Sequence, residues 1–335
     1  MSCYDVFEEM ALHKTELYAL RRLTSAILDG TTEITIIICS VKPERCEKAL
    51  ENISKTIGVN YEAFVFDNRE LNWGICKVYN QCAEKANSPI VCFMHEDVSI
   101  ETKNWGKIII DFIEKTPDCG IVGFAGGLEV EKNFIWWWYG AKRMNVNDEL
   151  TDKKDAYWKF NYKNHHYINP QNEACAQVLC VDGIFQLVKK TVWSEIKYDE
   201  KSYNGFHFYD VDFSLAVAQK YKNYVLLNMD VFHDSSGSID KEYIKNMFIF
   251  QNKWNKKLPC YLDSSFNKPS KSKIIRSELR QMIEICELCK KNRIKTGKFL
   301  KQIGNMNGIL MIPVFYIYYW NKKITGKIIN LLEKI

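Results

Sequence analysis

The stretch ITIIICSVKPERCEKALENISKTIGVNYEAFVFD, residues 34–67, decides the fold class of this chain. Residues 34–39 are almost all β-branched and apolar, which is typical of a strand buried on both faces. Pro43 then opens a segment whose apolar residues recur at helical spacing, and Gly58 follows it, as expected just past a helix. Residues 63–66 have the composition of a second strand. The stretch therefore predicts a strand, a helix and a strand, the repeating unit of an α/β protein.

The same alternation continues along the chain. Apolar residues recur at helical spacing over 75–86 and 105–113, a further helix is expected near 210–220, and short apolar runs at 90–94, 119–124, 178–181 and 224–228 predict strands. This pattern predicts a layered α/β domain with a largely parallel sheet, whose ligands gather at the carboxyl ends of the strands. Between residues 126 and 177 the periodicity fails, which indicates a long functional or mobile insertion rich in Trp, Tyr, Asn and His.

Charge is distributed unevenly along the 335 residues. The net charge is +5, but residues 268–335 hold 15 Lys and Arg against four Glu and no Asp. We expect three parts: a helical leader at 1–30, an α/β domain at 31–265 and a basic helical region at 266–335. A basic tail beside an acidic body favours one local polyanionic contact over general nucleic-acid binding. Anionic lipid is the leading partner, and no nucleic acid is expected.

The basic region carries the run GILMIPVFYIYYW, residues 308–320, interrupted by Pro313. A spanning helix needs about 20 apolar residues, so this run favours a helix lying in the membrane interface. A helix docked on the body or at a homodimer contact is the alternative. The 12 cysteines, with no apolar leader, predict a cytoplasmic location, and the basic region would place the protein peripherally on the inner face of the membrane. Cys286 and Cys289 lack the further ligands of a zinc site and are expected to be ordinary helix thiols.

Polar residues stand directly after three of the predicted strands: Ser40 after the first, Asp67, Asn68 and Arg69 after the second, and His95, Glu96 and Asp97 after the third. The carboxyl ends of parallel strands share one edge, so one ligand could meet all three groups. Local helix capping or a chain turn is the alternative for each group. The glycines of GFAGG, residues 123–127, lack the spacing of phosphate-binding loops. A nucleotide diphosphate would then need a divalent cation, for which Asp97 is the best-placed oxygen ligand.

Three further groups could carry chemistry. Asp210 and Asp212 open a predicted apolar helix, where they either complement the helix dipole or hold a general base. His233 follows the last predicted strand and is a candidate metal ligand, although a single His in a loop is commonly structural. The three consecutive Trp at 136–138 cannot all face one core, and their flat faces suit sugar rings or a lipid interface.

In their order and spacing these motifs resemble the inverting glycosyltransferases of family 2, over roughly residues 32–237, and in particular the bacterial branch whose metal motif begins with His. The resemblance implies a GT-A fold, a Rossmann-like αβα sandwich with a mostly parallel sheet, here followed by a C-terminal helical extension. Asp97 matches the last Asp of the family's Asp-x-Asp motif. His95 replaces the first Asp, and Glu96 fills the variable place. His233 falls where several GT-A enzymes have a late metal-binding His.

The resemblance also implies roles for individual residues. Asp97 and His233 would hold Mn or Mg, and Asp210 matches the catalytic base, with Tyr209 where Glu is usual. The donor nucleotide would be bound by Ser40, Asp67, Asn68, Asn80, His95 and Glu96. The acceptor would be bound by Trp137, Trp138, Asp182 and Gly183.

The implied activity is transfer of a sugar from a nucleoside-diphosphate sugar to a hydroxyl, with inversion at the anomeric carbon. A glycan or lipid-linked acceptor in bacterial surface polysaccharide or glycolipid synthesis would fit this reading. Two alternatives stay open from the residues themselves. One is a carbohydrate-binding or scaffold protein with a decayed site, and the other is a nucleotidyltransferase that shares a metal-bound nucleotide.

Overall fold

A computed structural model describes residues 20–24, 31–135, 156–159, 167–168, 172–234, 239–262, 271–294 and 320. The chain separates into two compact units, one made of residues 1–129 and 137–237, the other of 130–136 and 238–335. Residues 238–262 thus group with the C-terminal unit, although we expected the division near residue 265. The assignment of a functional boundary at 265 stays a prediction.

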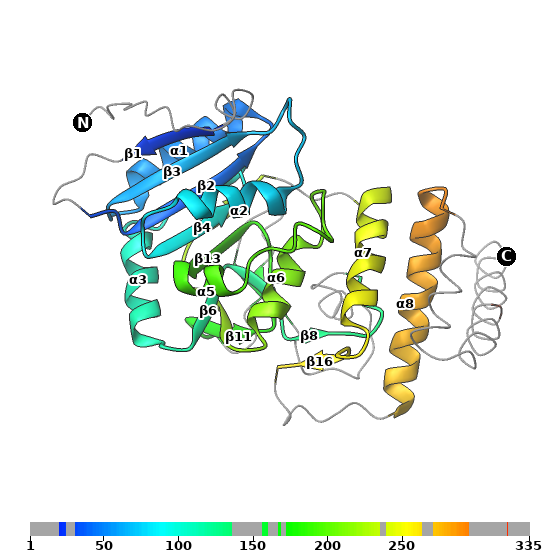
Figure 1. Ribbon diagram of the computed structural model, residues 1–335. Coiled ribbons are helices and arrows are strands. Elements are labelled where there is room, and N and C mark those ends of the chain that lie inside the picture. Colours follow the sequence, from blue (N-terminus) through cyan, green and yellow to red (C-terminus); the bar gives the residue numbers. More distant parts are fainter. Residues whose placement is uncertain are drawn as a thin grey trace, which may run out of the picture. The chain divides into compact units, whose positions relative to one another are not determined.

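The first unit has the α/β architecture expected from the sequence (Figure 1). Its helices are α1 (Pro43–Thr56), α2 (Ile75–Lys85), α3 (Trp105–Lys115), α5 (Lys190–Glu195) and α6 (Tyr209–Val217). Its larger sheet is built from β1 (Leu20–Thr24), β2 (Ile34–Ser40), β3 (Tyr61–Asp67), β4 (Ile90–Met94), β6 (Cys119–Gly123), β11 (Cys175–Val178), β13 (Phe185–Lys189) and β14 (Lys222–Leu226). Its smaller sheets use β5 (Val98–Ile100), β7 (Ala125–Gly127), β9 (Ala156–Lys159), β10 (Tyr167–Ile168), β12 (Cys180–Val181) and β15 (Val231–His233).

The larger sheet has the order β1-β3-β2-β4-β13-β6-β14-β11. Strands β3, β2 and β4 are parallel to one another, and β6 is parallel to β14. Because β13 lies antiparallel to both β4 and β6, the two parallel groups share one direction. Only β1, β13 and β11 run the other way among these eight strands. The expected α/β fold with a mostly parallel central sheet is therefore confirmed.

Helices cover both faces of this sheet, as the alternation of side chains along β2 requires. Ile34, Ile36 and Ile38 lie in one buried cluster with Ile53 of α1 and Ile109 of α3. Burying one such side chain contributes about 1.5–3 kcal/mol. On the opposite face an aromatic layer joins the sheet to α2 and α6. It comprises Tyr79, Phe93, Tyr198 and Phe213, whose successive ring centroids lie 4.9, 4.9 and 4.1 Å apart.

The expected helical leader at 1–30 is wrong for residues 20–24, which form β1 and pair antiparallel with β3. Edge pairing with β3 overrides the local sequence preference here. The rest of that leader lies outside the described residues. So do most of the insertion, including Trp137 and Trp138, and the apolar run at 308–320 apart from Trp320.

The second unit contains α7 (Lys241–Trp254) and α8 (Lys271–Lys291), and β8 (Glu129–Val130) pairs with β16 (Cys260–Tyr261). Asp240 caps α7 by accepting a hydrogen bond from the Tyr243 amide at 2.8 Å. Met247 and Phe250 on α7 are fully buried. Cys286 and Cys289 are buried free thiols on α8, as the sequence suggested. Among the helices of the described part of the chain, none has the length and apolar character needed to cross a membrane.

Candidate active site

The carboxyl ends of β2, β3 and β4 meet at one edge of the sheet. Ser40 lies opposite Asp67 in the parallel register, and Met94, the last residue of β4, lies opposite Ile38. The polar residues that follow these strands are therefore neighbours in space. This edge is where ligands of α/β sheets bind.

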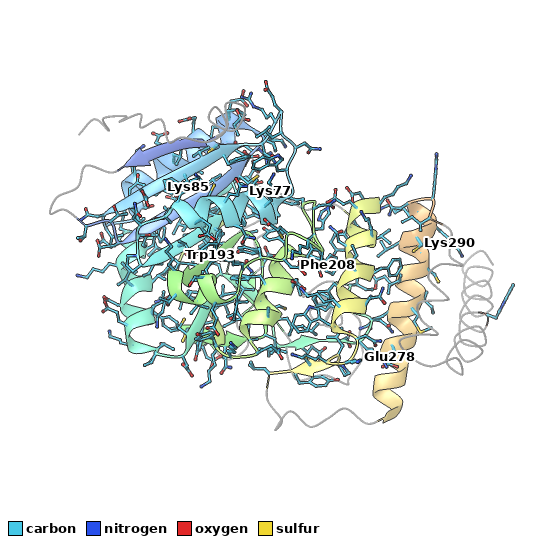
Figure 2. The ribbon with its side chains drawn as sticks, viewed as in Figure 1. Lys77, Lys85, Trp193, Phe208, Glu278 and Lys290 are labelled. Atoms are coloured by element: carbon cyan, nitrogen blue, oxygen red, sulfur yellow. The ribbon has the colours of Figure 1, made fainter. Side chains whose placement is uncertain are left out.

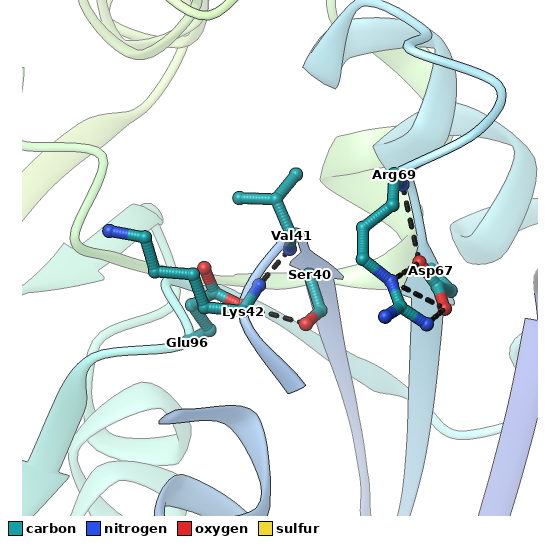
Figure 3. Close-up of polar contacts among 6 residues, drawn as sticks. All are labelled: Ser40, Val41, Lys42, Asp67, Arg69 and Glu96. Atoms are coloured by element: carbon teal, nitrogen blue, oxygen red, sulfur yellow. Dashed lines mark hydrogen bonds and ion pairs between the residues drawn. The ribbon is translucent and has the colours of Figure 1, made fainter. Parts of the chain in front are cut away.

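Glu96 fastens the loop after β2 to the end of β4 (Figure 3). One of its carboxylate oxygens accepts hydrogen bonds from the Ser40 hydroxyl at 2.7 Å, the Val41 amide at 3.1 Å and the Lys42 amide at 2.9 Å. The side chain is 9% exposed. Ser40 and Glu96 were both predicted to bind nucleotide, but these polar atoms are bonded to each other. In this arrangement Glu96 positions the loop that leads into α1.

Asp67 lies at the end of β3 and is held by Arg69. The Arg69 Nε donates to the two carboxylate oxygens at 2.9 and 3.1 Å, and this hydrogen bonding lowers the pKa of Asp67 (Figure 3). Asn68 closes the following loop, because its amide group donates to the Trp73 carbonyl and accepts from the Trp73 amide, at 2.8 and 2.7 Å. Trp73 in turn stacks on Phe66, with ring centroids 5.3 Å apart. A ligand approaching Asp67 would meet the Arg69 guanidinium.

His95, Asp97 and His233 form a group that could hold a metal ion. One ligand atom from each lies within 4.8 Å of the others, and it is the one such group found in the described ranges. Strand pairing explains how His233 arrives there. Strand β15 runs antiparallel to β5 and sets His233 opposite Val98, the residue after Asp97. The His233 Nε2 lies 3.4 Å from the Asp97 Oδ1.

Positive charge surrounds Asp97. The Arg45 guanidinium, from the first turns of α1, donates to Asp97 Oδ2 at 3.0 Å and lies 3.7 Å from Asp234 Oδ2. Burial would raise the pKa of Asp97, but the hydrogen bond from His233 and the charges of His233, His95 and Arg45 together lower it. Burial, together with the charge of the neighbouring His233, lowers the pKa of His95 to about 4. At neutral pH the group thus offers a carboxylate and a neutral imidazole, the states in which these side chains bind metals.

Asp210 lies at the start of α6, where a bulky residue adopts an unusual backbone conformation. Phe208, labelled in Figure 2, has φ of 68° directly before the helix. A non-glycine residue in this left-handed region is strained, and such strain is concentrated at functional sites. Asp210 accepts a hydrogen bond from the Gly183 amide at 3.0 Å. Burial, with a contribution from the charge of Asp182, raises the pKa of Asp210 to about 7, a value that suits a general base.

Tyr209 connects the metal-compatible group to the Asp210 side of the site. Its hydroxyl lies 2.7 Å from His95 Nε2 and donates to the Gly183 carbonyl at 3.1 Å. Gly183 must lack a side chain, since a Cβ there would lie 2.2 Å from the Tyr209 oxygen. Asp182 accepts from the Ile184 amide at 2.9 Å and stabilises this turn. Asp182 and Gly183, predicted as acceptor-binding residues, thus lie beside Asp210.

The predicted roles of Asn80 and of the two tryptophans, Trp137 and Trp138, stay predictions. Asn80 of α2 is 8% exposed, and its amide group is bonded to the backbone of Tyr198, at 2.9 Å to the carbonyl and 3.1 Å from the amide. It supports the segment before Asp210, and its nucleotide-binding role stays a prediction. Trp137 and Trp138 lie outside the described residues, so their acceptor-binding role also stays a prediction.

The sequence did not single out Arg45 or Phe206. The sequence pattern of α1 indicates only which of its side chains pack against the sheet, so nothing in it marks Arg45 as a partner of Asp97. Phe206 is 51% exposed, and its ring centroid lies 5.3 Å from that of His95. The aromatic residues that precede Asp210 in the sequence were the one available signal. Its flat face would suit a sugar ring.

Comparisons with known proteins identify the class of this chain. A family model described as "Glycosyltransferase like family" matches residues 34–254. Because this match spans well over half of the 335 residues, the chain belongs to that glycosyltransferase-like family. No curated protein matches the sequence.

Several solved structures match the chain at low sequence identity and with TM-scores below 0.5. A crystal structure of GalNAc-T7 with UDP, GalNAc and Mn²⁺ is 9% identical with a TM-score of 0.46, and the match covers 82% of this chain and 57% of that one. S. aureus TarS 1-349 is 10% identical with a TM-score of 0.39, covering 77% and 81%. A197 from STIV is 14% identical with a TM-score of 0.36, covering 61% and 87%. The chain therefore spans just over half of the GalNAc-T7 chain.

Proposed function

We propose that this glycosyltransferase moves a sugar from a nucleoside-diphosphate donor to a hydroxyl group of its acceptor, with inversion at the anomeric carbon. The observation that carries the proposal is the placement of a partly buried carboxylate with a raised pKa, Asp210, near the metal-compatible group of His95, Asp97 and His233. The Tyr209 hydroxyl contacts His95 and donates to the Gly183 carbonyl, and the Gly183 amide in turn donates to Asp210. An inverting transfer needs both parts: a base for the attacking hydroxyl and stabilisation of the leaving diphosphate.

Asp210 acts as the base in this proposal. It takes the proton of the acceptor hydroxyl as that oxygen attacks the anomeric carbon, and the bond from this carbon to the diphosphate breaks on the opposite side. Its hydrogen bond from Gly183 fixes the orientation of the carboxylate. A pKa near 7 leaves Asp210 largely ionised at mildly alkaline pH and still basic enough to accept a proton.

The residues at the metal-compatible group fit Mn²⁺ or Mg²⁺, because Asp97 supplies a hard oxygen ligand and the histidines supply nitrogen ligands that Mn²⁺ tolerates better than Mg²⁺. His95, Asp97 and His233 would hold the cation, which when bound would neutralise negative charge on the diphosphate. Arg45 is close enough to Asp97 to contribute further positive charge. Asp67 would contact the nucleobase, and Phe206 would pack against a sugar ring of donor or acceptor.

The donor test is stabilisation by a panel of nucleoside-diphosphate sugars, with and without Mn²⁺. A ligand at one hundred times its dissociation constant stabilises the folded state by about 2.7 kcal/mol, which a thermal melt detects. Release of free nucleoside diphosphate, and the anomeric configuration of the product by NMR, then test the transfer. Pyrophosphate release from nucleoside triphosphates would instead indicate a nucleotidyltransferase. Binding of sugars without either product would indicate a binding protein.

The acceptor, in this proposal, is a glycan or lipid-linked sugar of the bacterial envelope, reached from the cytoplasmic side. The basic region at 266–335 supports a contact with anionic lipid, because it holds a large excess of Lys and Arg. Flotation of the full chain with anionic and with neutral liposomes tests this contact. Equal behaviour with both would remove the membrane proposal, and a concentration-dependent mass in solution would favour the homodimer alternative.

A further inference from the structure

The hydrogen bonds of one tyrosine hydroxyl determine where the proton of His95 lies. Tyr209 is 3% exposed, and its ring packs against Tyr79 and Phe206, with centroids 5.8 and 6.2 Å away. Its oxygen is 2.7 Å from His95 Nε2 and 3.1 Å from the Gly183 carbonyl oxygen. A hydroxyl group carries one proton and can donate only one hydrogen bond at a time.

Gly183 and His95 differ in what they can do as partners of this hydroxyl. The Gly183 carbonyl can only accept, so Tyr209 donates its proton there. With that proton committed to Gly183, the same oxygen is an acceptor toward His95, an arrangement in which His95 Nε2 carries the donated proton. A histidine that binds a metal is neutral, and a neutral imidazole has one protonated nitrogen and one with a free electron pair. The free pair of His95 is therefore on Nδ1.

We infer that the Tyr209 hydroxyl holds His95 in the tautomer protonated at Nε2 and so makes Nδ1 the nitrogen that binds a divalent cation. This inference rests on the metal part of the proposed function and makes Tyr209 a positioning residue. Partners of this kind fix the orientation and proton position of ligating histidines in many metal sites. An ionised Glu at position 209, the residue usual in the resembling family, has no proton to donate to the Gly183 carbonyl.

Gly183 makes the arrangement rigid. Its carbonyl accepts from Tyr209, and its amide donates to Asp210 at 3.0 Å, so residues 209 and 210 are both bonded to this one glycine. There is no room for a Cβ at Gly183, because the Tyr209 oxygen would lie 2.2 Å away. The position of the His95 ring and that of the Asp210 carboxylate are thus fixed by the same turn.

The test uses the full chain and two measurements. Nitrogen-15 NMR of the imidazole rings in the metal-free protein at pH 8 reports which nitrogen of His95 is protonated, with His95→Gln used to assign its signals. Mn²⁺ affinity is measured from the EPR signal of free Mn²⁺. The variant is Tyr209→Phe, which keeps the packed ring and removes the hydroxyl. The matched control is Tyr203→Phe, which removes another buried hydroxyl, bonded to Asp212 at 3.2 Å.

We expect His95 of the unmodified protein to be protonated at Nε2. Tyr209→Phe should lose this preference and bind Mn²⁺ about 10–100-fold more weakly, the usual effect of losing such a partner, while Tyr203→Phe should change neither. Protonation of His95 at Nδ1 in the unmodified protein would overturn the inference. So would a Tyr209→Phe protein whose Mn²⁺ affinity stays within about twofold of the original. If the unmodified chain binds no Mn²⁺, the metal part of the proposed function fails, and the tautomer measurement alone still decides the position of the proton.

Discussion

Replacing Asp210 with Asn should make the folded protein more stable at alkaline pH. Burial and the charge of Asp182 raise the pKa of Asp210 from its ordinary value of 3.8 to about 7. Between these two values the folded state keeps a proton that the unfolded state has lost. The free energy of unfolding therefore falls as pH rises through this window and levels off above it. An Asn side chain has no charge to bury and avoids this loss.

The size of the effect follows from the same window. The interval from 3.8 to about 7, at about 1.4 kcal/mol for each pH unit, gives at most about 4 kcal/mol. Asp210 retains some solvent exposure, so we expect a gain of about 1–3 kcal/mol at pH 8 and a smaller gain at pH 5. The Asn oxygen can still accept the hydrogen bond from the Gly183 amide.

Urea unfolding at pH 5 and pH 8, followed by circular dichroism, measures this difference. Asp118→Asn is the control of opposite sign, because the hydrogen bond and charge of Lys222 lower the pKa of Asp118. Its loss should cost stability at pH 8. Turnover of Asp210→Asn should fall about 10²–10⁴-fold if Asp210 is the base. An Asp210→Asn protein that is less stable than the original at pH 8, or whose gain is the same at both pH values, would refute the reasoning.

Three further changes have defined outcomes. Asp182→Asn removes a negative charge that faces Asp210, whose other titratable neighbours Tyr198, Tyr209 and Cys180 are neutral. The pKa of Asp210 should then fall, and the acidic limb of the pH–rate profile should move to lower pH. An unchanged limb would contradict this prediction. Glu96→Gln replaces a carboxylate that accepts hydrogen bonds from three donors with a weaker acceptor, and it should lower the free energy of unfolding in urea by about 2–4 kcal/mol. A loss near zero would show that the loop after β2 is stable without the charge of Glu96. Arg45→Met removes a cation 3.0 Å from Asp97 and should tighten Mn²⁺ binding roughly tenfold. The Arg45 charge and a divalent cation about 5 Å apart would repel each other by about 1–2 kcal/mol in a water-like medium. Weaker Mn²⁺ binding in the EPR assay would contradict this prediction.

The order of the longer elements was predictable because most of them have their own local pattern. The apolar run at 90–94 is β4, and the helical spacing from residue 43 onward is α1. The position of β13 between β4 and β6 was not predictable, since it depends on pairing between residues far apart in sequence. Gln186 also obscures that strand. It is fully buried at the centre of β13, where its amide donates to the Val181 and Asp210 carbonyls.

The site was predictable as a set of residues and less so as a set of contacts. Asp97 and His233 could be named from their places after strands, but the β5–β15 pairing that brings them together involves two three-residue strands too short to show a pattern. Glu96 was expected to bind the nucleotide because it follows the third predicted strand together with His95 and Asp97. Sequence does not reveal which neighbour a polar atom will bond, and here the neighbour is the loop after β2.

The bond between Glu96 and Ser40 has a consequence for how these two positions can change in related chains. A residue at 96 with no acceptor atom leaves three donors of the loop after β2 without their acceptor, and an apolar residue at 40 removes one of those donors. Substitutions at the two positions should therefore occur together. In related chains position 96 should therefore be as restricted as positions 95 and 97 on either side of it, and its residue type should be predictable from residue 40.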